Sequence, residues 1–362
     1  MSWTPANLCC NLPTGFAFLV VACIAFYLIV IPQLDICGAR NKVTNFDRTA
    51  KKQILLVSYG RSGSAFTSAL ISRHGDIFFV PEPLYTLKLT SLRNYNEKDS
   101  VAIMKTLFTC EFTAQYTFAL DNVQFRLSES TQEFYECIIN SRVNGTAHVV
   151  CFLQLLEACR RHQATLIKTI RFQVKWAESL LAGNPNFRLL FLVRDPRGTL
   201  FSQTRVFESF NYYSTQMYNF SKEYCNGLAL DLHDAQRLHK LYPGQVKGIR
   251  YEEGAMNAVL YTKVIYNFLG LFFDEALVDY IANITSASLD DPRWRDIYGV
   301  IRRNSRQTMD LWRVNATFST VQDIDKSCAH LYPKLGYQPI VSKTHLHSDK
   351  SLVLDPKPGG IF

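Results

Sequence analysis

Short, continuous apolar runs alternate along the chain with longer segments in which apolar residues recur at helical spacing. The clearest runs begin at Ile54 and cover residues 187–193, and further strands are expected at residues 76–80, 164–168 and 246–251. Runs of this kind are typical of strands buried on both faces of a parallel sheet. Helical patterns occupy residues 67–73, 101–108, 150–161, 196–205, 225–241 and parts of 255–281. The alternation predicts an α/β domain, a parallel sheet flanked by helices, over residues 53–341.

Two segments lack this alternation. Residues 84–160 carry few strand signals and several helical ones, which predicts a helical excursion on the sheet. Residues 342–362 are rich in Pro, Gly, Lys and His, which predicts a flexible tail.

The start of the chain has a different character. The first 34 residues contain no Lys, Arg, Asp or Glu, and residues 15–34 are mostly apolar. About 20 such residues suffice to cross a bilayer, so the pattern predicts a transmembrane signal-anchor after a short cytoplasmic tail, residues 1–14. A cleaved signal peptide is the alternative, but it would have a basic start and small residues at a cleavage site. Residues 35–52 then form a polar stem. Basic residues follow the apolar segment, which by the positive-inside rule would place the domain in the cytosol.

Glycosylation acceptors and cysteines indicate the opposite orientation. Four Asn-X-Ser/Thr sequences follow the apolar segment, at Asn144, Asn219, Asn283 and Asn315. Seven of the ten cysteines also follow it without CxxC spacing, which favours disulfides of a secretory compartment over a zinc site. The odd cysteine is expected to be Cys37, either unpaired or linking two chains as a homodimer, and the other six allow fifteen pairings. We therefore expect a single-pass type II membrane protein with a lumenal domain.

The composition indicates an acidic binding partner but does not identify it. Of the 362 residues, 48% are hydrophobic and 19% are charged, and the formal net charge is +8. This charge fits a nucleotide, a polyanionic glycan or an anionic membrane surface. The chain lacks the dense Lys/Arg run of nucleic-acid-binding arms, so nucleic acid is not an expected partner. The eight histidines are scattered and form no metal-ligand pattern, so no metal is expected.

The stretch from Ile54 to Phe66 carries the clearest chemical signal. Its two glycines, Gly60 and Gly63, permit positive φ and close approach of the backbone to a ligand. The helix that follows would direct its first N–H groups and its positive dipole end into the turn, next to Arg61. The stretch therefore predicts a phosphate or sulfate site. An ordinary strand-turn-helix connection with an exposed arginine is the alternative.

A second candidate site follows the apolar run 187–193. Arg194 stands at its end, and Asp195 and Pro196 are suited to the cap and first turn of the next helix, which contains Ser202. Ligands of open α/β sheets bind at the carboxyl ends of the strands, so Arg194 and Ser202 could hold a second phosphate. Alternatively, Arg194 pairs with a carboxylate and Ser202 contacts no ligand.

Together the two sites resemble the pair of elements by which sulfotransferases bind 3′-phosphoadenosine 5′-phosphosulfate (PAPS). Residues 61–66 are similar to the 5′-phosphosulfate loop of the Golgi carbohydrate 6-O-sulfotransferases (the chondroitin, keratan and N-acetylglucosamine group), and residues 192–202 to their 3′-phosphate element. Further similar motifs stand in the family's order at residues 82–84, 109–112, 159–161, 167–171, 250–253, 312–313 and 336–337. The loop departs from the family at Ala65, where Ser is usual, and at Ser68, where Gly is usual; both are small replacements.

The resemblance implies a sulfotransferase fold and transfer of sulfate from PAPS, without a metal, to the 6-hydroxyl of a sugar. The acceptor would be N-acetylglucosamine, galactose or N-acetylgalactosamine in a glycan or proteoglycan of the Golgi lumen. The implied donor-binding residues are Arg61, Ser62, Gly63, Ser64, Ala65, Phe66, Thr67, Arg194 and Ser202.

The positions of charged residues near the predicted donor loop suggest where catalysis occurs. Glu82, between two prolines at the end of a strand, is the expected general base, and a turn residue that balances a cation is its alternative. Lys168 is expected to act in catalysis with Arg61. Lys168 and Arg171 would contact sulfate or an anionic acceptor, or else pair with core carboxylates.

Two other functions stay open. A P-loop kinase would end its loop in Gly-Lys-Ser/Thr, whereas here Arg61 precedes the second glycine and no Lys follows it. A catalytically silent membrane glycoprotein could keep the fold and only bind glycan, but the presence of Arg61, Glu82, Arg194 and Ser202 argues against it.

Overall fold

The structure, a computed structural model, describes residues 51–85, 96–112, 125–126, 128–144, 149–206, 217–296, 299–354 and 359–362. These residues all belong to one compact unit, residues 47–362. The predicted cytoplasmic tail, the predicted anchor and nearly all of the predicted stem lie outside them. Among the helices that are described, none is long and apolar enough to span a bilayer.

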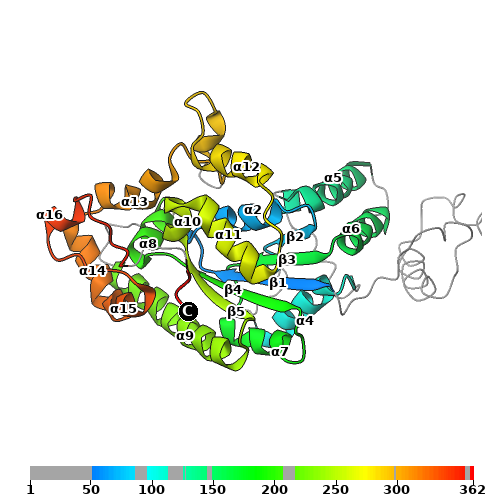
Figure 1. Ribbon diagram of the computed structural model, residues 1–362, viewed down its shortest axis with the longest axis horizontal. Coiled ribbons are helices and arrows are strands. Elements are labelled where there is room, and N and C mark those ends of the chain that lie inside the picture. Colours follow the sequence, from blue (N-terminus) through cyan, green and yellow to red (C-terminus); the bar gives the residue numbers. More distant parts are fainter. Residues whose placement is uncertain are drawn as a thin grey trace, which may run out of the picture. The chain divides into compact units, whose positions relative to one another are not determined.

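Five parallel strands form the centre of the domain, in the spatial order β2-β3-β1-β4-β5 (Figure 1). They are β1 (Lys52–Ser58), β2 (Ile77–Pro81), β3 (Ala164–Thr169), β4 (Phe187–Val193) and β5 (Val246–Arg250). All five predicted strands are thus confirmed, with small shifts at their ends. Because β1 lies between β3 and β4 in a parallel register, the carboxyl ends of these strands share one edge of the sheet.

Helices cover both faces of this sheet (Figure 1). They are α2 (Ser64–Ser72), α4 (Glu97–Phe108), α5 (Glu129–Asn144), α6 (Val149–Arg161), α7 (Glu178–Leu181), α8 (Pro196–Thr204), α9 (Met217–Leu241), α10 (Tyr251–Met256), α11 (Ala258–Leu269), α12 (Ala276–Thr285), α13 (Ser305–Asn315), α14 (Phe318–Cys328), α15 (Tyr332–Leu335) and α16 (Lys343–Leu346). Helices α2, α10 and α11 lie on one face, and α4, α7 and α9 lie on the other. Helices α4, α5 and α6 confirm the helical character predicted for residues 84–160.

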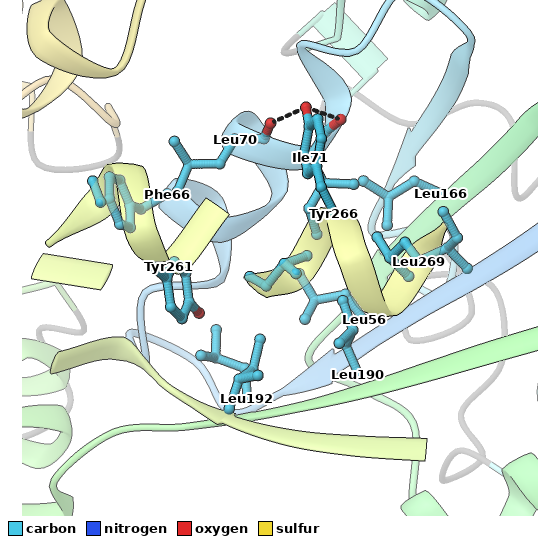
Figure 2. Packing of buried hydrophobic residues seen from close by; sticks show 14 of the residues in the cluster. Leu56, Phe66, Leu70, Ile71, Leu166, Leu190, Leu192, Tyr261, Tyr266 and Leu269 are labelled. Atoms are coloured by element: carbon cyan, nitrogen blue, oxygen red, sulfur yellow. Dashed lines mark hydrogen bonds between the residues drawn. The ribbon is translucent and has the colours of Figure 1, made fainter. Parts of the chain in front are cut away.

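The core between the sheet and helices α2 and α11 fixes the element that follows β1. Figure 2 shows Leu56, Leu166 and Leu190 of three strands packed against Phe66, Leu70 and Ile71 of α2 and against Tyr261, Tyr266 and Leu269 of α11. The Tyr266 hydroxyl donates to the Leu70 and Ile71 carbonyl oxygens at 2.9 and 3.4 Å (Figure 2). Full burial of a leucine, isoleucine or phenylalanine side chain stabilises a fold by roughly 1.5–3 kcal/mol. Helix α2 is therefore held rigidly, with its N-terminus at the carboxyl end of β1.

Three disulfides link the six cysteines that the structure describes. They join Cys110 to Cys159, Cys137 to Cys151, and Cys225 to Cys328. One of the fifteen pairings is thereby selected. Cys37 lies outside the described residues.

The predicted glycosylation acceptors lie on helices. Asn219, Asn283 and Asn315 are exposed, in α9, α12 and α13 respectively, and Asn144 is the last residue of α5. The exposed positions are accessible to a glycan, although glycosylation itself stays a prediction.

The described part of the C-terminal segment is packed, in contrast to the predicted flexible tail. Leu346, at the end of α16, is fully buried, and Val353 pairs with Tyr337 in an isolated β-bridge. Arg313 of α13 donates to the carbonyl oxygens of Leu346 and Lys350 at 3.0 and 2.8 Å. A buried guanidinium thus orders a segment whose local composition favours disorder.

Candidate active site at the carboxyl edge of the sheet

The loop between β1 and α2 has an unusual backbone. Arg61 has φ of 67°, which is uncommon for a residue with a side chain, and Gly63 has φ of 91°. A Cβ atom added to Gly63 would lie 2.2 Å from Cδ2 of Tyr251, so only glycine fits here. This close approach explains the second glycine of the predicted anion loop.

The first turn of α2 offers backbone donors to a ligand. Gly63 is the N-cap residue, and no side chain caps the helix. An α-helix leaves its first N–H groups without intrahelical acceptors, and its dipole is positive at this end. The loop and α2 therefore place backbone donors and a positive dipole end at the turn where the sequence predicts an anion site.

The side chains of the loop mostly stabilise the loop itself. The Ser62 hydroxyl donates to the Tyr59 carbonyl oxygen at 2.6 Å, and the Thr67 hydroxyl lies 3.2 Å from the hydroxyl of Tyr261. Phe66 is buried edge-on against the Tyr251 ring, whereas Ala65 is exposed. Ligand contacts from this loop would accordingly come from the backbone and from Arg61 more than from these two hydroxyls.

The two predicted phosphate elements meet in the structure. Arg194, directly after β4, donates from NH1 to the Arg61 carbonyl oxygen at 3.1 Å. Arg61 in turn donates from Nε to the Ser202 hydroxyl at 3.2 Å. The Arg194 guanidinium carbon lies 4.7 Å from the Tyr251 ring centroid, a cation–π contact. Residues separated by more than a hundred positions in the sequence therefore form one cluster.

Arg194 keeps hydrogen-bonding capacity in this cluster. It is 9% exposed, and its buried Nε has no hydrogen-bond partner among the described residues. It also forms no ion pair with a carboxylate within that part of the chain. A buried guanidinium partnered by a carbonyl and an aromatic face is suited to bind an anionic ligand.

A buried polar network supports Arg194 from behind. The next residue, Asp195, caps α8 and accepts three hydrogen bonds of 2.8–2.9 Å from Arg197, which is fully buried. The Asp195 N–H donates to Glu252 at 3.0 Å, and Tyr337 donates to the other Glu252 oxygen at 2.8 Å. Burial, with the charge of Asp195, raises the pKa of Glu252 to about 7. The network fixes the start of α8, and thereby the position of Arg194.

Glu82 lies at the same edge, at the end of β2. It has φ of 50°, and its N–H donates to the Lys168 carbonyl oxygen at 2.8 Å. Its carboxylate pairs with Lys168 Nζ at 2.9 Å and with Arg171 NH1 at 2.5 Å, and accepts from the Ile170 N–H at 3.3 Å. The structure thus brings Glu82, Lys168 and Arg171 together. Both cations form ion pairs with Glu82.

Sequence reasoning missed two residues of this edge. Tyr251 belongs to the similar motif at residues 250–253, for which no ligand contact was predicted. Its ring contacts Gly63, Phe66 and Arg194. Gln203 donates to the Gly60 carbonyl oxygen at 2.9 Å and so holds the start of the loop. Tyr251 follows directly after β5, so the rule that ligands bind at the carboxyl ends of strands could have identified it.

No group of three or more His, Cys, Asp or Glu side chains suited to a metal ion occurs among the residues with described positions. The described edge offers guanidinium, ammonium, carboxylate and backbone N–H groups.

Comparisons with known proteins show which sequences this chain resembles. The sequence profile of the sulfotransferase family matches residues 53–275. Carbohydrate sulfotransferase 1 of Danio rerio is 25% identical over 92% of this chain and 91% of its own. Human carbohydrate sulfotransferase 6 is 25% identical over 84% and 85%, and mouse carbohydrate sulfotransferase 3 is 23% identical over 83% and 71%.

Solved structures resemble the fold more distantly. Mouse sulfotransferase SULT7A1 complexed with PAP is 14% identical, with a TM-score of 0.42 over 78% of this chain and 84% of its own. A sulfotransferase from Alicyclobacillus acidocaldarius is 15% identical, with a TM-score of 0.38 over 64% and 90%.

Proposed function

The chain belongs to the sulfotransferase family, and from this premise we propose that it transfers sulfate from PAPS to the 6-hydroxyl of a sugar in a glycan. N-acetylglucosamine, galactose and N-acetylgalactosamine are the candidate sugars. The observation that carries the proposal is the single cluster formed by Arg61, Arg194 and Ser202, because a donor with phosphates at both ends needs two linked anion sites.

The donor would lie across the ends of β1 and β4. Its 5′-phosphosulfate would accept from the backbone of residues 62–67 and from Arg61, and its 3′-phosphate would accept from Arg194 and Ser202. The free N–H groups and dipole of α2 support the first assignment. The buried guanidinium of Arg194 supports the second. These residues fit PAPS because they offer donors and positive charge at two neighbouring points.

The chemical step is an in-line displacement at sulfur. The sugar oxygen forms a bond to sulfur while the bond from sulfur to the 5′-phosphate oxygen breaks, and adenosine 3′,5′-bisphosphate (PAP) leaves. We propose that Glu82 accepts the hydroxyl proton, since it lies at the same edge of the sheet as the donor loop. Arg61 and Lys168 would balance the charge that develops on the transferred group and the leaving phosphate.

The alternatives are less well supported. A P-loop kinase would need a lysine after the second glycine, and Ser64 stands at that position. A silent glycan-binding protein would have no use for an arginine buried beside an anion loop, and the geometry of Arg194 therefore favours an enzyme.

We place the domain in the Golgi lumen, held by a type II anchor at residues 15–34. The three disulfides and the exposed acceptors Asn219, Asn283 and Asn315 support a secretory compartment. Cys37 remains the proposed link in a homodimer. Mass mapping of glycans on these asparagines tests the orientation, and unmodified acceptors on protein from a secretory cell line would contradict it.

The proposed activity is tested with the full-length protein, radiolabelled PAPS and a panel of acceptors that end in each of the three sugars. We expect label in at least one acceptor and, after linkage analysis, sulfate at the 6-position. Bound PAP with no labelled acceptor would favour the silent glycan-binding protein. Label from γ-labelled ATP would favour the kinase.

A further inference from the structure

A short segment, residues 359–362, lies against β5, the last strand of the sheet. β5 pairs with β4 on one side and ends the sheet on the other. The Ile361 N–H donates to the Gly248 carbonyl oxygen at 2.8 Å, and Lys247 Nζ donates to the Gly359 carbonyl oxygen at 2.6 Å. The segment therefore docks on the backbone of β5, beside which Figure 1 places this end of the chain.

Two glycines permit this docking. Gly360 has φ of 93°, and a Cβ atom added to it would lie 2.6 Å from the Gly248 carbonyl oxygen. A Cβ atom added to Gly248 would lie 2.5 Å from Ile361 Cγ1 and 2.7 Å from the Phe362 ring. Because a side-chain carbon does not fit at such distances, both positions need glycine. The Phe362 ring also packs against His239 of α9, with the ring centroids 5.3 Å apart.

The docked segment reaches a buried ion pair. The Gly360 N–H donates to the carboxylate of Glu253, which is 1% exposed. The same carboxylate lies 2.8 Å from Arg250 NH2, and Arg250 NH1 donates to the Gly336 carbonyl oxygen at 3.3 Å. A buried acceptor that loses a donor destabilises its surroundings. The segment is therefore part of the polar network at the carboxyl end of β5.

The turn that contains this ion pair also carries Tyr251. Arg250 ends β5 and Glu253 lies in the first turn of α10, so Tyr251 stands between the two partners. Its ring packs against Gly63 of the donor loop and lies 4.7 Å from the guanidinium carbon of Arg194. Because the ion pair fixes how α10 leaves β5, it also fixes the direction of the Tyr251 side chain.

We propose that residues 359–362 are a positioning element of the donor site. Their docking on β5 holds the Arg250–Glu253 pair, and through it Tyr251, in the arrangement that binds PAPS. The inference rests on the proposed donor site and adds to it a segment that acts through Tyr251. If docking strengthens PAP binding, bound PAP strengthens docking by the same factor.

Calorimetric titration of the full-length protein with PAP tests this coupling. Deletion of residues 359–362 and the substitution Gly248→Ala should each weaken PAP binding roughly 3- to 30-fold, the range for changes that act on a ligand through intervening residues. Gly75→Ala is the matched control, since an added Cβ there has no atom within 4 Å and Gly75 precedes β2 at the other edge of the sheet. It should leave PAP affinity within about twofold.

The two changes should not add. In the deletion variant, the atoms that a Cβ at position 248 would meet are gone, so Gly248→Ala should weaken PAP binding no further. Without a docked segment, Gly248→Ala would favour the strand, because glycine is less favourable than alanine inside one. Additive losses of PAP affinity would mean that Gly248 acts through β5 alone, and would overturn the inference.

Two further measurements separate positioning from a role in folding alone. The amide hydrogen of Ile361 should exchange more slowly when PAP is bound, by the same factor as docking strengthens PAP binding. In the acceptor assay, the KM for PAPS should rise by that factor in Gly248→Ala, while kcat at saturating PAPS stays within about twofold. Exchange of Ile361 that is equal with and without PAP would refute the inference.

The outcomes also separate this inference from the proposed function. If the wild-type protein binds PAP and the deletion variant binds it equally well, the positioning role is refuted and the donor site stands. If the wild-type protein binds no PAP, the proposed function itself is wrong. Denaturant unfolding shows whether the variants are folded, and if the deletion variant is not, the exchange of Ile361 in the wild-type protein decides.

Discussion

The two sides of the carboxyl edge treat their cations differently. Over β1 and β4, Arg194 contacts a carbonyl oxygen and an aromatic ring and has no carboxylate partner within the described part of the chain. Over β2 and β3, Lys168 and Arg171 share the carboxylate of Glu82. On the first side a ligand would supply the direct ion-pair partner of the cation, whereas on the second side Glu82 already supplies it.

This difference suggests that one side of the edge determines how strongly the nucleotide binds and the other determines which glycan is selected. A buried arginine that forms no ion pair gains more from an anionic ligand, because burial strengthens electrostatic interactions. A partly exposed cation that already has a carboxylate partner gains less. We therefore infer that the donor side sets affinity for the nucleotide, and that the acceptor side selects among glycans.

The largest expected effect is on the chemical step. Glu82→Gln should lower kcat by roughly 100-fold or more with every acceptor, the range for loss of a general base, while PAP affinity stays unchanged. Glu129→Gln, which breaks the exposed pair with Arg73, is the control. If kcat is kept and only the KM of anionic acceptors rises, Glu82 positions the two cations without taking the proton.

A second test concerns the packing that joins the donor loop to Arg194. Gly63→Ala should lower the free energy of unfolding by roughly 2–5 kcal/mol, because it combines a strained φ with a clash against Tyr251. Gly183→Ala is the matched control, since Gly183 also has positive φ but nothing within 4 Å of an added Cβ. Its cost should be about 1–2 kcal/mol. If chemical denaturation gives the same loss of unfolding free energy for Gly63→Ala and Gly183→Ala, the contact with Tyr251 does not restrict position 63.

The pH dependence of stability tests the network behind Arg194. Glu252 has a pKa raised to about 7 in the folded protein, above its ordinary value of 4.5, so the folded state holds this proton more tightly than the unfolded state. Its contribution to stability is therefore complete below pH 4.5 and is lost as the pH rises towards 7, by an amount on the order of 1–3 kcal/mol.

Glu252→Gln removes this titration and can keep both hydrogen bonds, since the Tyr337 hydroxyl can accept as well as donate. Relative to the wild-type protein, the variant should gain stability as the pH rises from 5 to 8. Parallel stability curves, measured by denaturant unfolding across this range, would contradict the assigned pKa.

The sequence was sufficient for the architecture because the central strands are rich in apolar residues and most site residues stand at or just after the end of a strand. Arg61, Glu82, Lys168 and Arg194 could be placed at one edge on that basis alone, and the structure places them there. The sequence pattern could not specify which groups each side chain contacts. Glu82 faces two cations, and Ser62 turns its hydroxyl to the Tyr59 carbonyl oxygen.

The other differences also arise from contacts that are distant in sequence. The C-terminal segment was predicted to be flexible from its composition, yet the donors that order it come from Arg313 in another helix. The disulfide pairing depends on which helices pack together, which spacing does not reveal. The position of Tyr251 directly after β5 indicates that it lies at this edge, but its ring contact with Gly63 depends on tertiary packing.

The central claim, that the donor side binds an anion that the protein does not itself supply, is tested most directly by calorimetric titration with PAP. Arg194→Gln should weaken PAP binding roughly 10- to 100-fold, the effect of losing a charge-assisted hydrogen bond, whereas Arg171→Gln should leave it within about twofold. Equal affinities in the wild-type protein and Arg194→Gln, or an equal loss in both variants, would contradict the account.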